Sequence, residues 1–145
     1  MRHLLGFIFI VLIFSCNGDR SERNPFLQEI GFRFDLNLNL PEYSPLTNTG
    51  NAIYVDNVGV GTRGAFVINI GFNQFRVFEA SCPNHAPNSC STTELSGQTA
   101  ICSCEDYEYS LFTGQLLNKP EGEGRFYDML EYRATISGNV VTISN

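Results

Sequence analysis

Four cysteines and one histidine, close together in the chain, have the most distinctive chemistry of the sequence. The first box is Cys82–His85 (CPNH), with Cys90 after it, and the second box holds Cys102, Cys104 and Glu105 (CSCE). Thiolates either bind soft metals and iron–sulfur clusters or pair as disulfides, and imidazole binds many transition metals. The sequence contains 2 histidines, and the other one is His3 at the N-terminus. The boxes therefore offer cysteine-based metal or redox chemistry with no second histidine in reach.

The N-terminus indicates how the boxes reach their compartment. A basic start, Met1–His3, precedes an apolar run from Leu4 to Phe14. That run is shorter than the roughly 20 residues of a membrane-spanning helix and is typical of a secretory signal peptide. Ser15 followed by Cys16 resembles the lipobox of bacterial lipoproteins, which implies acylation of Cys16; an ordinary signal peptide is the alternative. We expect a signal peptide over residues 1–15, a flexible tether over 16–26 and one domain over 27–145.

A lipid anchor places the protein on a membrane of the bacterial cell envelope, either on the periplasmic face or in the outer membrane. The formal net charge is −6 and the only lysine is Lys119. Such an acidic domain has no electrostatic footprint for nucleic acid. It is also repelled by anionic lipid, so the acyl chains must provide the attachment. We expect a membrane contact through the anchor and an unidentified protein partner.

An exported domain with an even number of cysteines favours disulfides over free thiols. Four cysteines allow three pairings, and the sequence alone does not choose among them. No nucleophile has a neighbouring base and an orienting partner, so we expect no catalytic residue. The protein is therefore predicted not to be an enzyme, and at most to be an electron-transfer component of an oxidoreductase.

The elements that position the boxes are strands. Alternating apolar and polar residues over Phe32–Leu40 predict a half-buried strand, which Pro41 ends. Further short strands are expected over four segments: Ala52–Val55, Ala65–Ile70, Phe75–Ala80 and the hairpin Glu131–Ile143, with glycine-rich turns between them. No window shows a helical period. This pattern predicts an all-β domain, an antiparallel sandwich or barrel.

The boxes and the residues after them resemble the Rieske iron–sulfur family. That family has C-x-H in its first box and C-P-C-H-G-S-x-F in its second, followed by a short strand and a Thr-Gly turn. Cys82 and Cys102 fall on the two cysteine ligand positions, and Tyr109–Gly114 and the hairpin at Gly138 match the rest. The resemblance spans about residues 50–145 and is closest to a Bacteroidetes-like lipoprotein branch. It implies a Rieske-like fold with a small cluster-binding subdomain of two loops, about residues 80–114.

The two histidine positions of the family are replaced. A Rieske centre holds one iron with two cysteines and the other with two histidines, whereas Asn84 and Glu105 stand at the histidine positions here. An amide oxygen and a hard carboxylate do not reproduce that ligand field. If a cluster is bound, its ligands are Cys82, Cys102, His85 and Glu105, or a third cysteine replaces one of them.

The resemblance also implies a disulfide. In respiratory members a cysteine after the first box pairs with the middle cysteine of the second, and Cys90 and Cys104 match these residues. Closing a loop of about 15 residues stabilises the fold by roughly 3 kcal/mol. Cys82 and Cys102, which bind one iron in the family, then lie close enough for a second disulfide. We therefore expect a disulfide-stapled, cluster-free binding or structural module without a cofactor; the alternative is a 2Fe–2S electron-transfer protein with atypical ligands.

Overall fold

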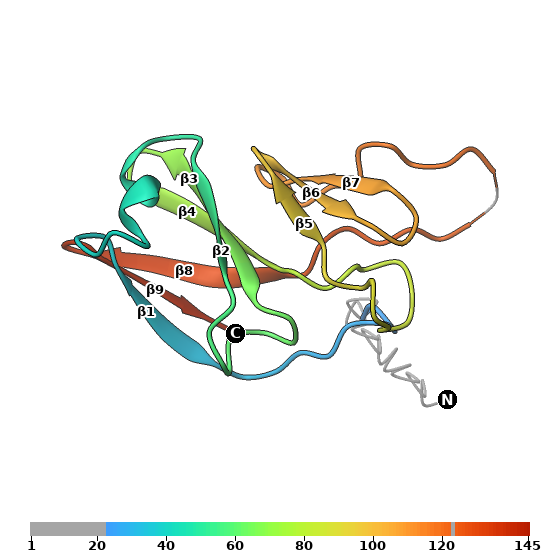
Figure 1. Cartoon of the computed structure of the whole chain (residues 1–145), viewed down its shortest axis with the longest axis horizontal. Coiled ribbons are helices and arrows are strands. Elements are labelled where there is room, and N and C mark those ends of the chain that lie inside the picture. Colours follow the sequence, from blue (N-terminus) through green and yellow to red (C-terminus); the bar gives the residue numbers. More distant parts are fainter. Residues whose placement is uncertain (1–22, 123) are drawn as a thin grey trace, which may run out of the picture.

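Two antiparallel sheets make up the computed structural model, which describes residues 23–122 and 124–145 (Figure 1). The larger sheet has the order β1-β9-β8-β4-β3-β2 and the smaller one β5-β6-β7. The predicted all-β antiparallel class is confirmed. The strands are β1 (Arg33–Asn37), β2 (Ala52–Val55), β3 (Ala65–Gly71), β4 (Gln74–Glu79), β5 (Glu94–Ser96), β6 (Thr99–Cys102), β7 (Tyr107–Ser110), β8 (Glu131–Ser137) and β9 (Val140–Ser144), with one 3-10 turn, η1 (Ser44–Thr47).

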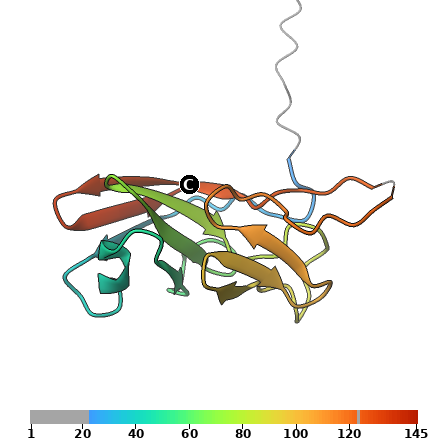
Figure 2. The ribbon, with the colours of Figure 1, turned by 90° about the horizontal axis from the view of Figure 1, so that it is seen from above.

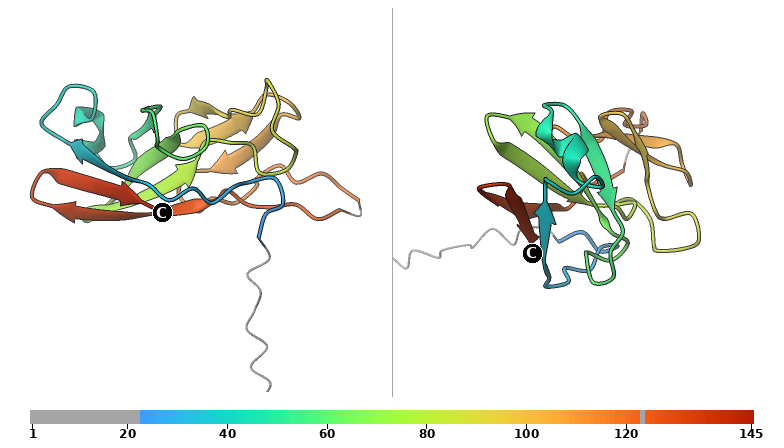
Figure 3. Two further views of the ribbon diagram at one scale, coloured as in Figure 1. Left: turned by 90° about the horizontal axis from the view of Figure 1, so that it is seen from below. Right: turned by 60° about the vertical axis from the view of Figure 1, so that its left-hand side comes forward.

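The predicted signal peptide and Cys16 lie outside the described residues, as does most of the predicted tether. Within residues 23–122 and 124–145, no helix is long and apolar enough to span a membrane. The described segment before β1 runs beside the chain that leads into β8 (Figure 3). There the Phe26 and Tyr127 rings meet edge to face, with centroids 6.3 Å apart.

Strand β3 supplies both hydrophobic cores because its two faces are buried. Ala65 and Val67 point into the core enclosed by the curled larger sheet. Phe66 and Ile68, on the opposite face, join the core shared with the smaller sheet. A run of apolar residues without alternation is what a strand buried on both faces requires. The smaller sheet consequently lies over the outer face of β3 and β4 (Figure 2).

The predicted hairpins are confirmed. β3 and β4 pair around a two-residue turn in which Phe72 and Asn73 have φ of 52° and 58°. Two consecutive positive φ values are typical of the tight turns whose twist matches the flanking strands. β8 and β9 pair from Arg133↔Ser144 to Ser137↔Val140. Together these hairpins, β1 and β2 form the curled larger sheet.

The first strand is shorter than the sequence predicts. β1 ends at Asn37, where the side-chain Oδ1 accepts a hydrogen bond of 3.0 Å from the Asn39 backbone N–H. This Asx turn bends the chain before Pro41 is reached. Leu40, expected on the buried face, is 44 % exposed. The alternation of apolar and polar residues therefore continues through residues 38–40, beyond the end of the strand.

Candidate functional site

The two cysteine boxes lie at the end of the smaller sheet. The first box belongs to the connection between β4 and β5, and the second forms the turn between β6 and β7. A β-bridge between Ser81 and Thr92 closes the base of the first loop. Just beyond it, the Cys82 N–H donates to the Ser91 carbonyl at 2.7 Å. In the second turn Asp106 has φ of 56°, a left-handed conformation that aspartate adopts more readily than most residues.

Two disulfides join the loops. The inner disulfide, Cys82–Cys102, has a Cα–Cα distance of 5.7 Å, and the outer disulfide, Cys90–Cys104, has one of 5.5 Å. Both distances lie in the usual range for disulfides. The two sulfurs of the inner disulfide belong to buried residues within the second core, whereas both residues of the outer one are half-buried. Each disulfide therefore joins the first loop to the second box, and the inner disulfide is more deeply buried than the outer one.

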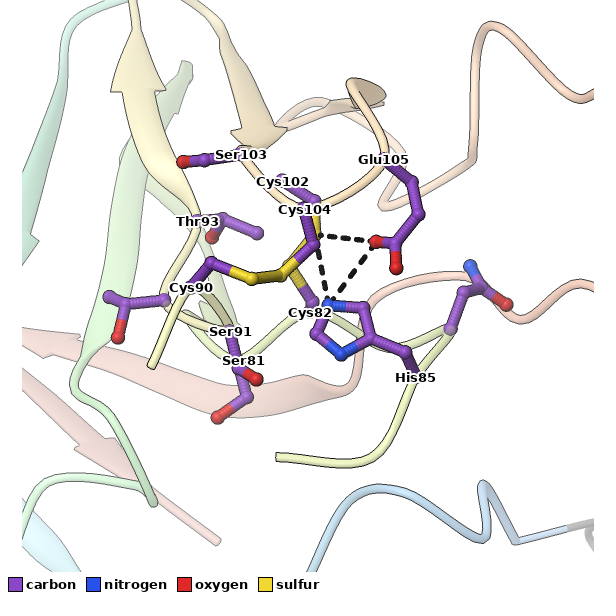
Figure 4. Close-up of a disulfide and its surroundings, with 12 residues drawn as sticks. Ser81, Cys82, His85, Cys90, Ser91, Thr93, Cys102, Ser103, Cys104 and Glu105 are labelled. Carbon is purple, nitrogen blue, oxygen red and sulfur yellow. Dashed lines mark hydrogen bonds and ion pairs between the residues drawn. A yellow bond between two sulfur atoms is a disulfide. The ribbon is translucent and has the colours of Figure 1, made fainter. Parts of the chain in front are cut away.

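His85 and Glu105 converge on the inner disulfide (Figure 4). The His85 Nε2 lies 3.3 Å from the Cys102 Sγ and 3.3 Å from the Glu105 Oε2. The Glu105 Oε2 lies 3.4 Å from the same sulfur. His85 sits one residue beyond the position that the family resemblance gives to a histidine, and its side chain nevertheless points into the site. The four residues expected to bind a cluster are thus brought together.

Asn84 stands at the other position where the family has a histidine. Its side chain is hydrogen-bonded to Tyr109 and to the segment before β8. Its Oδ1 accepts from the Tyr127 N–H at 2.7 Å, and its Nδ2 donates to the Tyr127 carbonyl at 2.8 Å. Nδ2 also donates to the Tyr109 hydroxyl at 2.9 Å. We call this set of three hydrogen bonds the Asn84 clamp. Both ends of the amide are used, so Asn84 is a structural link between the first box and the segment before β8.

Tyr109 provides one of the hydrogen-bond partners in the Asn84 clamp. Its ring is fully buried in the second core. Burial raises the pKa of its hydroxyl to about 12, and the hydrogen bond from Asn84 opposes that rise. The hydroxyl is therefore neutral at ordinary pH and serves as a hydrogen-bonding partner.

The described end of the predicted tether contacts the first box, because the Asn24 Nδ2 donates to the Pro83 carbonyl at 2.6 Å.

A buried carboxylate supports the first loop from below. Glu79 is fully buried, and its two oxygens accept five hydrogen bonds: from the N–H groups of Thr62, Arg63 and Ser81, and from the hydroxyls of Ser81 and Tyr132. A buried carboxylate is stable in a protein when such donors replace its water shell. Glu79 thereby fixes the glycine-rich turn before β3 against β4.

Arg63 carries that support to the first box. Its guanidinium donates to the Thr92 hydroxyl at 3.2 Å and to the Asn88 carbonyl at 2.8 Å. The Asn88 Oδ1 in turn accepts from the Cys90 N–H at 2.9 Å. Sequence reasoning had no role for Glu79 or Asn88. The segment 75–80 carries two charges, Arg76 and Glu79, so the sequence alone does not mark Glu79 as the buried one, and nothing local marks Asn88.

The site does not fit a Rieske-type 2Fe–2S centre. Such a centre needs two imidazoles on one iron, and the chain has His85 alone at this site. The Asn84 amide is held in the clamp at both ends. The Glu105 carboxylate is a harder ligand than imidazole. The residues fit two other uses: disulfide staples, as the structure has them, and thiolate chemistry if the staples are reduced.

No protein-family model and no curated protein matches the sequence. Among solved structures, a chain in the complex of reduced oxygenase and oxidized ferredoxin of carbazole 1,9a-dioxygenase matches with a TM-score of 0.48 and 18 % identity, over 81 % of this chain and 94 % of that one. The plasma membrane Rieske protein of the cyanobacterium Synechocystis PCC 6803 matches with a TM-score of 0.47 and 19 % identity, over 63 % and 84 %. At these values the functional argument rests on this chain's own geometry.

Proposed function

We propose that this protein is a lipid-anchored binding or structural module with a Rieske-like domain that is stapled by two disulfides and holds no iron–sulfur cluster. The Asn84 clamp carries the proposal. A residue at a ligand position whose donor and acceptor are both bonded to the opposite segment contributes to folding and is not free to bind iron. The two disulfides give the surviving cysteines the same structural use.

The lipoprotein part of the proposal rests on the sequence. The apolar run that ends at Cys16 supports export and acylation. The charge of −6 disfavours a nucleic-acid partner and supports attachment to the membrane through acyl chains and not through contact with anionic lipid. The partner is proposed to be another envelope protein. Replacing Cys16 with alanine in the full chain is expected to move the protein from the membrane fraction to the soluble fraction. Unchanged membrane association of that variant would contradict the anchor.

The convergence of His85 and Glu105 on Cys102 favours a second candidate function. An electron-transfer protein with a 2Fe–2S cluster held by Cys82, Cys102, His85 and Glu105 would use the same side chains. Iron–sulfur clusters are held by thiolates, with histidine on one iron in the high-potential type. His85 is half-buried and Glu105 is exposed, so this edge of the site would face an electron-transfer partner.

One experiment separates the two candidates. The full chain is purified in detergent from an oxidising compartment, its visible spectrum is recorded, and its iron is counted. The stapled module is expected to be colourless and iron-free. A red-brown chain that contains about two irons and shows the absorption of a 2Fe–2S centre would contradict it and establish the electron-transfer function.

A further inference from the structure

Three side-chain atoms that can bind a metal ion meet at one point of the site, and two of them belong to the His85–Glu105 ion pair. The His85 Nε2, the Glu105 Oε2 and the Cys102 Sγ form a triangle with edges of 3.3, 3.3 and 3.4 Å. In a tetrahedral zinc site, with metal–nitrogen and metal–oxygen bonds of about 2.0–2.2 Å and metal–sulfur bonds of about 2.3 Å, neighbouring ligand atoms lie about 3.3–3.6 Å apart. The triangle therefore has the size of one face of such a tetrahedron.

The orientation of the imidazole is fixed for binding through Nε2. The other ring nitrogen, Nδ1, lies 2.9 Å from the Ala86 carbonyl oxygen. A carbonyl only accepts hydrogen bonds, so Nδ1 carries the proton and donates it. In the neutral ring Nε2 then presents its lone pair to the triangle. A backbone carbonyl that holds the second nitrogen of a histidine is the usual outer-shell partner of a metal-binding imidazole.

The Cys82 Sγ lies beside this triangle. This atom belongs to a set of donor atoms, with those of His85, Cys102 and Cys104, that all lie within 4.8 Å of one another. It is bonded to the Cys102 Sγ in the inner disulfide. Two thiolates on one zinc ion lie about 3.8 Å apart, so the sulfurs need to separate by about the length of a bond. Cys104 belongs to the outer disulfide with Cys90 and is not part of this ligand set.

We propose that Cys82, Cys102, His85 and Glu105 form a mononuclear site for a thiolate-binding divalent cation such as Zn²⁺, and that reduction of the inner disulfide opens this site. The proposal goes beyond the cluster-free module proposed above and rests on it, because a cluster would use the same residues. The disulfide form staples the loops, and the metal form holds them together through four bonds to one ion.

The electrons and protons of this switch balance with a dithiol as reductant. A dithiol gives two electrons and two protons to the inner disulfide and becomes a disulfide itself, and two thiols form at Cys82 and Cys102. Binding of the divalent cation then displaces one proton from each thiol, since the thiolate is the ligand. The intact disulfide has no thiolate and binds the cation weakly.

Cobalt(II) is the probe for the test, because it reports tetrahedral geometry and sulfur ligation in its absorption. The iron-free full chain is reduced anaerobically, the reductant is removed and Co²⁺ is titrated. We expect one Co²⁺ per chain, strong tetrahedral ligand-field bands, a sulfur-to-cobalt charge-transfer band, and displacement by Zn²⁺. The oxidised chain is expected to show none of these. Absence of binding in the reduced chain, or equal binding in the oxidised chain, would overturn the proposal.

Variants test the ligand set. His85→Ala and Glu105→Gln are each expected to raise the dissociation constant for Co²⁺ by at least about 100-fold, beyond the usual effect of losing an outer-shell partner. The double variant Cys90→Ser/Cys104→Ser is the matched control and should bind Co²⁺ like the reduced parent. Circular dichroism checks that each variant folds. Parent-like binding by both ligand variants, or loss of binding in the control, would overturn the ligand set.

The two proposals fail in different ways. Iron in the chain as purified, before any reduction, overturns the cluster-free function. An iron-free chain that keeps its disulfides but binds no Co²⁺ after their reduction overturns the metal site alone.

Discussion

Replacement of Asn84 by alanine removes all three hydrogen bonds of the Asn84 clamp at once. The lost contacts are those to the Tyr127 N–H at 2.7 Å, the Tyr127 carbonyl at 2.8 Å and the Tyr109 hydroxyl at 2.9 Å. Each such bond contributes about 0.5–1.5 kcal/mol net. We therefore expect the free energy of unfolding to fall by about 2–4 kcal/mol, a large share of the 5–15 kcal/mol typical of a domain.

Urea unfolding followed by circular dichroism measures this loss. With a denaturant slope of about 2 kcal/mol per M, the unfolding midpoint is expected to move down by about 1–2 M. The matched control is Asn39→Ala. Asn39 is exposed, and its side chain accepts one hydrogen bond, from the Asn139 Nδ2 at 3.2 Å. We expect that control to change the free energy of unfolding by no more than about 0.5 kcal/mol.

The outcome decides whether Asn84 is a structural residue or a vestige of a ligand. Similar midpoints for the Asn84→Ala and Asn39→Ala variants would refute the clamp and, with it, the main support for the cluster-free function. Asn84→Asp gives a second reading. It keeps an oxygen for the Tyr127 N–H but turns a second oxygen toward the Tyr127 carbonyl, so it should also lose stability at neutral pH.

Three further predictions follow from burial and hydrogen bonding. Stepwise reduction should open the half-buried outer disulfide before the buried inner one, so alkylation mass spectrometry should find a two-thiol species before a four-thiol species; the reverse order would contradict the burial. Glu79→Gln turns an NH₂ group toward N–H and O–H donors and should lower the free energy of unfolding by about 2–4 kcal/mol, as measured with urea. The control Glu131→Gln, in the exposed ion pair with Arg76, should lower it by about 1 kcal/mol or less. Equal losses in the two variants would refute the role of Glu79. Burial raises the pKa of Tyr109 to about 12 from 10.0, so its contribution to stability is complete below pH 10 and falls by about 1.4 kcal/mol per pH unit between pH 10 and about 12; Tyr109→Phe should remove that part of the fall, and an unchanged pH profile would count against the buried neutral hydroxyl.

Local patterns were sufficient for most of the larger sheet. The β3–β4 and β8–β9 hairpins follow from apolar runs on either side of short polar turns, and both are present. The predicted end of β1 was wrong because an Asx turn at Asn37 ends the strand, although the alternation of apolar and polar residues continues to Leu40. Alternation reports which residues suit a strand, and a side-chain hydrogen bond to the backbone decides where the strand stops.

The cysteine boxes were predictable as a group, because a shared motif spacing brings two loops to one place. The details within the site were not. The bonding partner of Asn84 lies 43 residues away at Tyr127, and no local pattern encodes a contact at that separation. The direction of the His85 side chain also depends on the Ala86 carbonyl and the second loop. Long-range hydrogen bonds of this kind become visible only once the two sheets are placed together.

The central claim is that the four domain cysteines staple the loops and leave none for iron. The most direct measurement is a peptide mass map of the full chain, denatured and alkylated without reduction after purification from an oxidising compartment. We expect no alkylated cysteine at positions 82, 90, 102 or 104, and linked peptides for Cys82–Cys102 and Cys90–Cys104. Alkylated Cys82 and Cys102 beside an intact Cys90–Cys104 link would contradict it, because that is the pattern a chain leaves when it has held a metal on those two thiolates.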